Sequence, residues 1–143
     1  MEFEDLLIHI NEMMHSSIQR FKQEAIGRGP QADLTISQLL YVETIFRLGK
    51  PSVTELAQAL GISKASASAG AHKLIWKGLV KAKRSGDDHR VYYLGLTDKG
   101  EKVIEAEKHA VKDFSTRIRQ SLNDREVRML EEIFTKIVNT GTQ

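Results

Sequence analysis

The chain has 143 residues, of which 41% are apolar and 28% charged, an ordinary globular composition that suits one domain with appended helices. It contains no cysteine, which excludes disulfide scaffolds, thiolate zinc sites, cysteine nucleophiles and thiol-based redox sensing. The apolar runs are too short to cross a bilayer, and the acidic start MEFEDLLIHI is unlike a secretory signal, so we expect no membrane association and a cytoplasmic location.

The net charge of +2 is unevenly distributed along the chain. Residues 62–90 carry 7 Lys/Arg against 2 Asp/Glu, whereas residues 1–50 carry 5 against 7. A basic middle between near-neutral flanks is the charge pattern of a nucleic-acid-binding segment, although a charged face can also be merely solvated.

Two helices are predicted in the first third of the chain. Apolar residues recur at three- and four-residue steps from Phe3 to about Ile26, which is the helical period, and the segment GRGP at 27–30 ends this helix. A second helix starts after Thr35, which forms a capping box with Gln38, and it ends at the segment GKP at 49–51.

A pair of helices follows. Ser52 caps a short helix over 53–60, with Glu55 as the second member of a capping box. Gly61 comes directly after it, and a further helix is predicted from Ser63 to about Trp76.

The rest of the chain is predicted to form a hairpin and two more helices. Residues 79–83 and 91–96 favour strands, and the segment SGDD at 85–88 between them has turn chemistry. Thr97 and Asp98 start a long helix to about Leu122, and Asn123 with Glu126 starts the last helix. The fold class is therefore mostly α, with about six helices and one β-hairpin.

The stretch TELAQALGIS at 54–63 predicts a helix-turn-helix. Two short helices can cross closely if the first carries a small residue, here Ala57, and if the turn tolerates positive φ, here Gly61. We expect Leu56, Leu60 and Ile62 to form the apolar contact beneath the turn. An ordinary αα-hairpin remains the alternative for this stretch alone.

The second helix of this motif has the composition of a recognition helix. Its Ser, Lys and His side chains can reach phosphates and base edges, although its alanines can equally be plain helix formers. We expect Leu74, Ile75 and Trp76 to be core residues. Gly70 costs about 1 kcal/mol relative to alanine inside a helix, which predicts a packing reason for it.

The hairpin adds further positive charge. Lys81, Lys83 and Arg84 precede its tip and Arg90 follows it. We interpret Asp88 as a partner that orients Arg90, so that the arginine can enter a minor groove. A solvated turn with incidental charges is the alternative.

Together these segments resemble the winged helix-turn-helix of the multiple antibiotic resistance regulator (MarR) family. The resemblance rests on LAQALGISK at 56–64, KGLV at 77–80, DHR at 88–90 and LTDKG at 96–100. It departs from the family at Ala69, where members often carry arginine, at Gly70, where they carry a bulkier residue, and at His89. The loss of an arginine removes a potential guanine contact.

The resemblance implies a sequence-specific transcriptional regulator, and we expect a homodimeric repressor released by a small aromatic or anionic effector. It implies a dimerisation helix in 1–34, a DNA-binding lobe in 35–100 and dimerisation helices in 101–143. The partner is double-stranded DNA with a pseudo-palindromic operator. The residues expected to contact DNA are Ser63, Lys64, Ser66, Ser68, His72, Lys73, Arg84, Asp88, His89 and Arg90.

The sequence bears on three other functions. A non-specific architectural DNA binder stays open because the recognition helix is rich in alanine. A metal-responsive regulator would need His9, His15 and His109 to converge at the dimer helices, with Glu12 or Glu105, and no tight ligand spacing supports it. No catalytic or cofactor motif is present, so we expect neither an enzyme nor a bound cofactor or metal.

Overall fold

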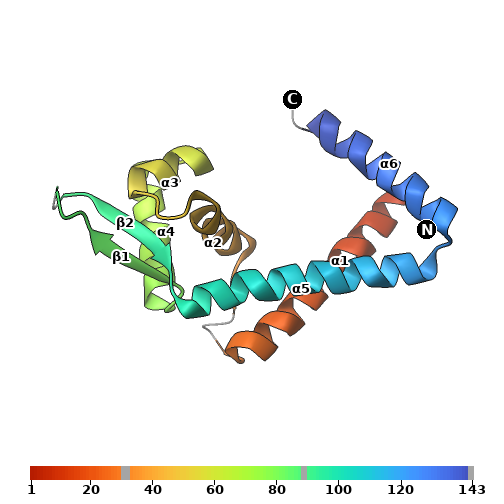
Figure 1. The fold of residues 1–143 in the computed structure, drawn as a ribbon, viewed down its shortest axis with the longest axis horizontal. Coiled ribbons are helices and arrows are strands. Elements are labelled where there is room, and N and C mark those ends of the chain that lie inside the picture. The colour runs from red at the N-terminus through yellow and green to blue at the C-terminus, as the bar shows by residue number, and fades with distance from the viewer. Residues whose placement is uncertain (30–32, 88–89, 142–143) are drawn as a thin grey trace.

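A computed structural model of the chain describes residues 1–29, 33–87 and 90–141. These residues form six helices and one antiparallel hairpin (Figure 1). In chain order the elements are α1 (Phe3–Ile26), α2 (Ile36–Leu48), α3 (Val53–Leu60), α4 (Lys64–Trp76), β1 (Val80–Arg84), β2 (Tyr92–Leu96), α5 (Asp98–Ser121) and α6 (Asp124–Gly141). The mostly helical fold class and the element order predicted from the sequence are confirmed.

The helix starts follow the predicted capping chemistry. Thr35 and Gln38 form a reciprocal capping box, with Gln38 N–H bonded to Thr35 Oγ1 at 3.0 Å and Thr35 N–H to Gln38 Oε1 at 3.2 Å. Ser52 accepts the N–H of Glu55, and Thr97 accepts that of Gly100. Such caps satisfy backbone donors that the first helical turn leaves unpaired, so local sequence alone fixes where these helices begin.

Helices α3 and α4 make the predicted helix-turn-helix. Gly61 ends α3 in the left-handed region, at φ 65° and ψ 34°, where only glycine sits without strain. Ala57 is buried in the helix crossing, as expected from its small size. Leu56 is fully buried and Leu60 is partly buried against the same core, but Ile62 is 36% exposed, so the predicted apolar contact rests on Leu56 and Leu60.

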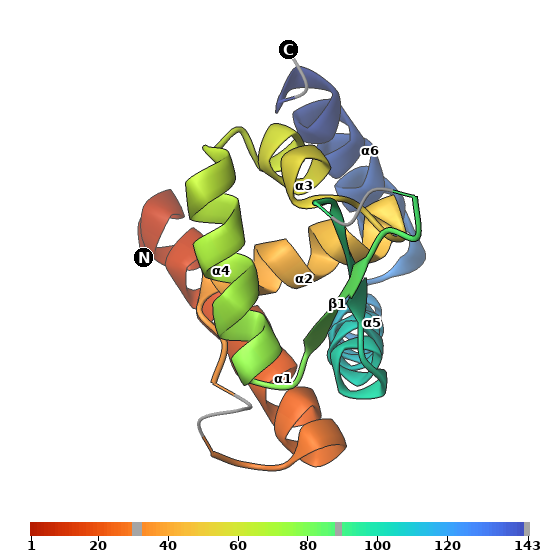
Figure 2. The same cartoon turned by 90° about the vertical axis from the view of Figure 1, so that its left-hand side faces the viewer.

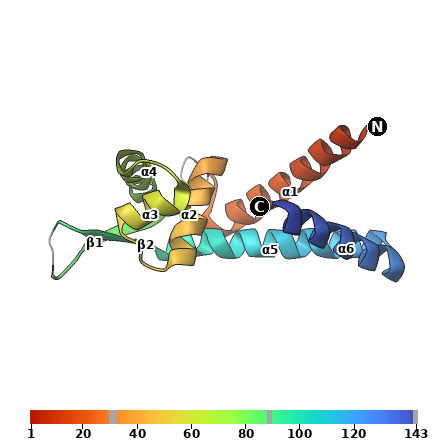
Figure 3. The same ribbon diagram turned by 90° about the horizontal axis from the view of Figure 1, so that it is seen from above.

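The hairpin pairs β1 with β2 in an antiparallel register that matches Val80 with Leu96 and Arg84 with Tyr92. Its base is anchored to the lobe because Leu94 N–H donates to the carbonyl of Pro51 at 2.8 Å, and Ser52 bridges to Tyr93. The two strands extend away from the helices toward Arg84 and Tyr92, both of which are exposed (Figure 3).

One core joins α2, α3, α4, the hairpin and the start of α5. Its buried members come from each of these elements: Val42, Ile45, Leu56, Leu74, Leu94 and Val103. We call this part of the molecule the lobe. Burial of such side chains contributes about 1.5–3 kcal/mol each, so the lobe has an internal source of stability.

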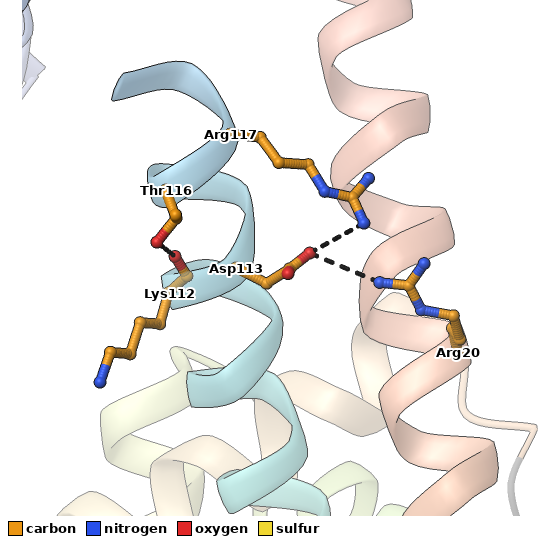
Figure 4. A network of polar contacts seen from close by, with 5 residues as sticks. All are labelled: Arg20, Lys112, Asp113, Thr116 and Arg117. Atoms are coloured by element: carbon orange, nitrogen blue, oxygen red, sulfur yellow. Dashed lines mark hydrogen bonds and ion pairs between the residues drawn. The ribbon is translucent and has the colours of Figure 1, made fainter. Parts of the chain in front are cut away.

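Helix α5 extends from the lobe, α1 packs obliquely across it, and α6 turns back beyond the far end of α5 (Figure 1). We call α1, α6 and the part of α5 outside the lobe core the arm. Asp113 on α5 joins the two long helices, since its Oδ2 lies 3.4 Å from Arg20 Nη2 on α1 and 3.1 Å from Arg117 Nη2 (Figure 4). These side chains are partly exposed, so the network orients the helices more than it stabilises them.

The arm leaves much of its apolar surface uncovered in the single chain. None of the described residues of α6 is buried. The large apolar side chains exposed on α1 and α6 are Phe3, Leu6, Leu7, Ile8, Ile10, Met13, Met129, Ile133, Phe134, Ile137 and Val138. Among the described residues, none of the helices combines the length and apolar character needed to traverse a bilayer.

Candidate nucleic-acid interface

Helix α4 and the hairpin lie at the end of the molecule opposite α6, with α4 in front of the lobe (Figures 1 and 2). The predicted contact residues within the described part of the chain lie on α4 or at its N-cap, at the end of β1, or in the turn before β2: Ser63, Lys64, Ser66, Ser68, His72, Lys73, Arg84 and Arg90. All of them are exposed except Ser68, which is half-buried. Asp88 and His89 lie outside the described residues, and so does the predicted pairing of Asp88 with Arg90.

The first turn of α4 is held by its own serines. Ser63 Oγ accepts the N–H of Ser66 at 3.1 Å and also bonds to Ser66 Oγ at 2.9 Å. This pair fixes the helix start, and Lys64 follows it on the surface. Both serine hydroxyls therefore serve first as a cap, and a phosphate would have to share them.

The two faces of α4 differ sharply in side-chain type. Ala67, Ala71 and Leu74 are buried against the lobe. The opposite face carries Ala65, Ala69, His72, Lys73 and Trp76, all exposed and spaced at helical intervals. Because the side chains along the first half of this face are short, a groove of a nucleic-acid duplex could approach the backbone of α4 closely.

Gly70 has the packing reason that the sequence analysis expected. A Cβ at this position would collide with the ring of Tyr41, which lies across α4 from α2. The Tyr41 hydroxyl donates a hydrogen bond to the carbonyl of Ser66 at 3.3 Å. Tyr41 thus sets the distance and rotation of α4 on the lobe, and no signal in the sequence pointed to it.

The prediction that Trp76 is a core residue is wrong. Leu74 is fully buried and Ile75 is half-buried, but Trp76 is 80% exposed. Successive helical residues point about 100° apart, so three neighbours cannot share one buried face. Lys77, the next residue, links the end of α4 to the start of α2, because its Nζ donates to the carbonyl of Asp33 and to Gln38 Oε1.

The hairpin holds one of its cations in place. Arg84 Nε donates to the Tyr92 hydroxyl at 2.8 Å, and its guanidinium lies 5.2 Å from the centroid of the Tyr92 ring. The two residues are cross-strand partners, which puts their side chains on one face. Tyr92 therefore orients Arg84, and the sequence signal for this pair is an aromatic residue opposite a basic one in the predicted hairpin.

The electrostatics of this end favour an anionic partner. Six exposed cations gather on α4 and the hairpin: Lys64, Lys73, Lys81, Lys83, Arg84 and Arg90. Asp87 near the tip is an exposed acid on the same elements. A long surface of this sign with a protruding helix is suited to the phosphates and groove of a duplex.

A metal site finds no support in the geometry. In residues 1–29, 33–87 and 90–141, no three His, Cys, Asp or Glu side chains are grouped so as to hold a metal ion, so His9, His15 and His109 do not converge as the metal hypothesis required. The His109 ring instead stacks on Phe21, with centroids 6.3 Å apart.

Comparison with known proteins agrees with this site. A model of the MarR family matches residues 32–91, a range that contains α2, α3, α4 and β1. No curated protein matches the sequence.

Several solved structures share the fold over nearly the whole chain. A Staphylococcus aureus MepR mutant bound to an oligodeoxyribonucleotide aligns with a TM-score of 0.70 at 20% identity, covering 98% of each chain. Streptococcus pneumoniae FabT in complex with DNA gives 0.68 at 16% identity, covering 97% of this chain and 96% of its own. The YusO protein from Bacillus subtilis gives 0.68 at 22% identity, covering 97% and 99%.

Proposed function

We propose that this chain, whose residues 32–91 match a model of the MarR family, is a sequence-specific transcriptional regulator that acts as a homodimeric repressor. Members of that family are DNA-binding regulators and not enzymes. The observation that carries the finer proposal is the gathering of exposed cations on α4 and the hairpin, at the end of the lobe away from α6. The protein acts in the cytoplasm, together with its DNA.

In this proposal α4 enters the major groove and the hairpin follows the backbone into the adjacent minor groove. In the major groove, the residues that contact bases and phosphates are Ser63, Lys64, Ser66, Ser68, His72 and Lys73. From the hairpin, the residues that contact DNA are Arg84, Asp88, His89 and Arg90. MepR and FabT, whose fold this chain shares, are both described bound to DNA, which supports a duplex as the partner. Arginine in a minor groove responds to groove width more than to base identity.

The uncovered faces of α1 and α6 supply the argument for a homodimer. A groove of about 620 Å³ runs between α1, α5 and α6, and its lining is mostly apolar, including Ile10, Phe114, Leu130 and Phe134. A second copy presents the same apolar helices, so a two-fold pairing buries both sets. Residues 1–34 and 101–143 are then the dimerisation segments, and 35–100 form the DNA-binding lobe.

A two-fold dimer also defines the kind of DNA site. Two copies of α4 related by a two-fold axis meet successive major grooves about 34 Å apart, which requires a pseudo-palindromic operator. Repression ends when a small aromatic or anionic effector changes the distance between the two recognition helices. The family supports this effector step, and the sequence offers no pocket signature of its own.

A non-specific architectural DNA binder is the second candidate. Ala65 and Ala69 occupy the exposed face of α4, where base-reading side chains would be expected. Such a protein would bind through phosphates alone, and its affinity would fall steeply with salt on every sequence.

If the protein binds DNA as a dimer, a substitution that breaks the dimer should also weaken DNA binding. Ile137→Glu places a charge on the exposed apolar face of α6, whereas Lys136→Glu changes the charge of a neighbouring exposed residue. We expect Ile137→Glu to sediment as a monomer and to lose at least about tenfold in affinity for DNA from upstream of its own gene, because one half-site contributes less than two. Lys136→Glu should remain dimeric. A monomeric wild-type chain with full affinity would contradict the proposal.

A further inference from the structure

The outer face of α4 ends in the one tryptophan of the chain, Trp76. Ala65, Ala69, His72 and Trp76 follow one another at steps of three and four residues, so they form a single stripe along the helix. All four are exposed, whereas the buried side chains of α4 lie on the opposite face. This outer stripe therefore points away from the core of the lobe over the length of the helix (Figure 2).

Trp76 contributes little to the packing of the single chain. It is 80% exposed, although tryptophan is highly buried on average and covering its ring removes a large apolar area from water. Leu74 fills the core at this end of α4, so the indole is not a missing part of that core. The free energy gained by covering the ring is therefore available only to a second molecule.

The height of the outer stripe changes along α4. Ala65 and Ala69 carry one methyl group each, whereas Trp76 carries the largest of the side chains. Ala65 and Trp76 are separated by about 16 Å along the axis at 1.5 Å per residue, which exceeds the major-groove width of about 12 Å. When the first half of α4 crosses the groove, Trp76 lies at the edge of the groove, where the sugar-phosphate backbone runs.

The chemistry at this end of the stripe suits a phosphate. Lys73 is exposed and lies three residues before Trp76, so the two side chains are neighbours on the helix surface. The indole ring has one N–H donor and no acceptor, and the ammonium group has donors only. The pair therefore offers only donors to phosphate oxygens, and the flat apolar ring suits the surface of a deoxyribose.

We propose that Trp76 is a backbone contact of the recognition helix, in which its indole N–H donates to a DNA phosphate and its ring covers the adjacent sugar. The inference rests on the part of the proposed function that places α4 in the major groove. A backbone contact of this kind carries no sequence information and fixes the register and orientation of the helix on the duplex. It should therefore strengthen binding to every duplex equally.

Fluorescence provides a direct test, because the emission of the single tryptophan reports on Trp76 alone. Two duplexes of equal length are used at low salt, one from upstream of the protein's own gene and one scrambled. We expect acrylamide quenching of the wild type to fall when either duplex binds. Without DNA the indole should be quenched equally at every protein concentration. Protection that grows with protein concentration would mean that a second copy covers Trp76, and it would overturn the inference.

Two variants separate the N–H group from the ring. Trp76→Phe keeps an aromatic ring and loses the donor, whereas Trp76→Ala loses both. We expect affinity losses of about fivefold and at least about tenfold, respectively, on both duplexes. Circular dichroism checks that both variants keep the fold. Ile36→Ala is the control, because Ile36 is also 80% exposed but lies on α2, and it should bind as wild type.

Salt dependence distinguishes the indole from a cation. A neutral donor releases no counterion, so the Trp76 variants should keep the wild-type slope of log affinity against log salt, whereas Lys73→Ala should reduce that slope by about 1.

The outcomes for Trp76 and for the proposed function are separable. Wild-type affinity in Trp76→Ala, or a loss confined to the duplex from upstream of the gene, would overturn the inference. Equal wild-type binding to both duplexes, weakened in Trp76→Ala, would support the inference and count only against sequence-specific regulation. A wild-type chain that binds neither duplex would overturn both.

Discussion

The ring of Tyr41 on α2 occupies the space beside Gly70 on α4 that the Cβ of any other residue would need. The two residues are 29 positions apart, and their contact sets how closely the recognition helix approaches the lobe. The rotation of α4 toward a DNA groove therefore depends on a helix that carries none of the residues expected to contact DNA.

Replacing Gly70 with alanine should destabilise the fold although alanine is the better helix former. The added methyl group collides with Tyr41, which costs about 1–3 kcal/mol, against a helix-propensity gain of about 1 kcal/mol. Urea unfolding would measure the loss. Gly86→Ala is the control, because nothing lies within 4 Å of a Cβ there. In a Tyr41→Ala background the effect of Gly70→Ala should vanish or change sign, and an unchanged loss there would refute the collision.

Leu74 and Trp76 should respond very differently to truncation. Leu74→Ala opens a cavity in the core and should lower the free energy of unfolding by about 2–5 kcal/mol. Trp76→Ala removes an 80% exposed side chain and should change it by less than about 1 kcal/mol. Equilibrium unfolding of both variants at the same protein concentration compares them, and a Trp76→Ala loss equal to that of Leu74→Ala would mean that this ring is buried.

Arg84 on the hairpin should contribute to DNA binding together with its partner on β2, Tyr92. Arg84→Ala should weaken DNA binding by about 1–3 kcal/mol and leave the fold intact, because it removes one oriented cation from an exposed strand end. Tyr92→Phe keeps the ring under the guanidinium but removes the hydroxyl that accepts from Arg84 Nε, so its loss should be smaller. Fluorescence anisotropy with operator DNA measures both, and Lys99→Ala on α5 controls for loss of net charge. Equal affinities of Arg84→Ala and wild type would remove Arg84 from the interface.

The protonation of Glu107 should make stability fall as pH rises toward neutrality. The folded state raises the pKa of Glu107 from its ordinary 4.5 to about 7, so its protonated form stabilises the fold fully below the lower value. That contribution is lost as pH rises through the higher value, by about 1–2 kcal/mol once screening of a half-exposed group is allowed for. Urea unfolding of Glu107→Gln and wild type at pH 5 and pH 8 tests this. The two proteins should diverge at the higher pH, with the variant more stable, and parallel curves would refute it.

Local sequence was enough to predict most of the secondary structure. The helix starts at Thr35, Ser52, Ser63 and Thr97 depend on side chains within three residues of each cap, and all four are found where expected. The left-handed turn at Gly61 is equally local. These features need no tertiary contact to be specified, which is why a pattern in one sequence finds them.

Features that depend on distant contacts were not predictable. The sequence predicts some packing reason for Gly70 but does not identify Tyr41 as the neighbour that a Cβ would meet. The burial of Lys22 depends on contacts between helices that are far apart in the sequence. The sequence wrongly predicts Trp76 as a core residue, because three consecutive hydrophobic residues do not show which of them faces the core. The interface cations were found by composition, whereas the partner of Arg84 required the strand register.

Footprinting on DNA from upstream of the protein's own gene tests whether a dimer binds DNA sequence-specifically. At physiological salt, with scrambled DNA of equal length as the reference, we expect one protected pseudo-palindrome of about 16–20 base pairs. Weak, uniform protection of both DNAs that disappears as salt rises would contradict the claim and indicate a protein that binds only the phosphate backbone.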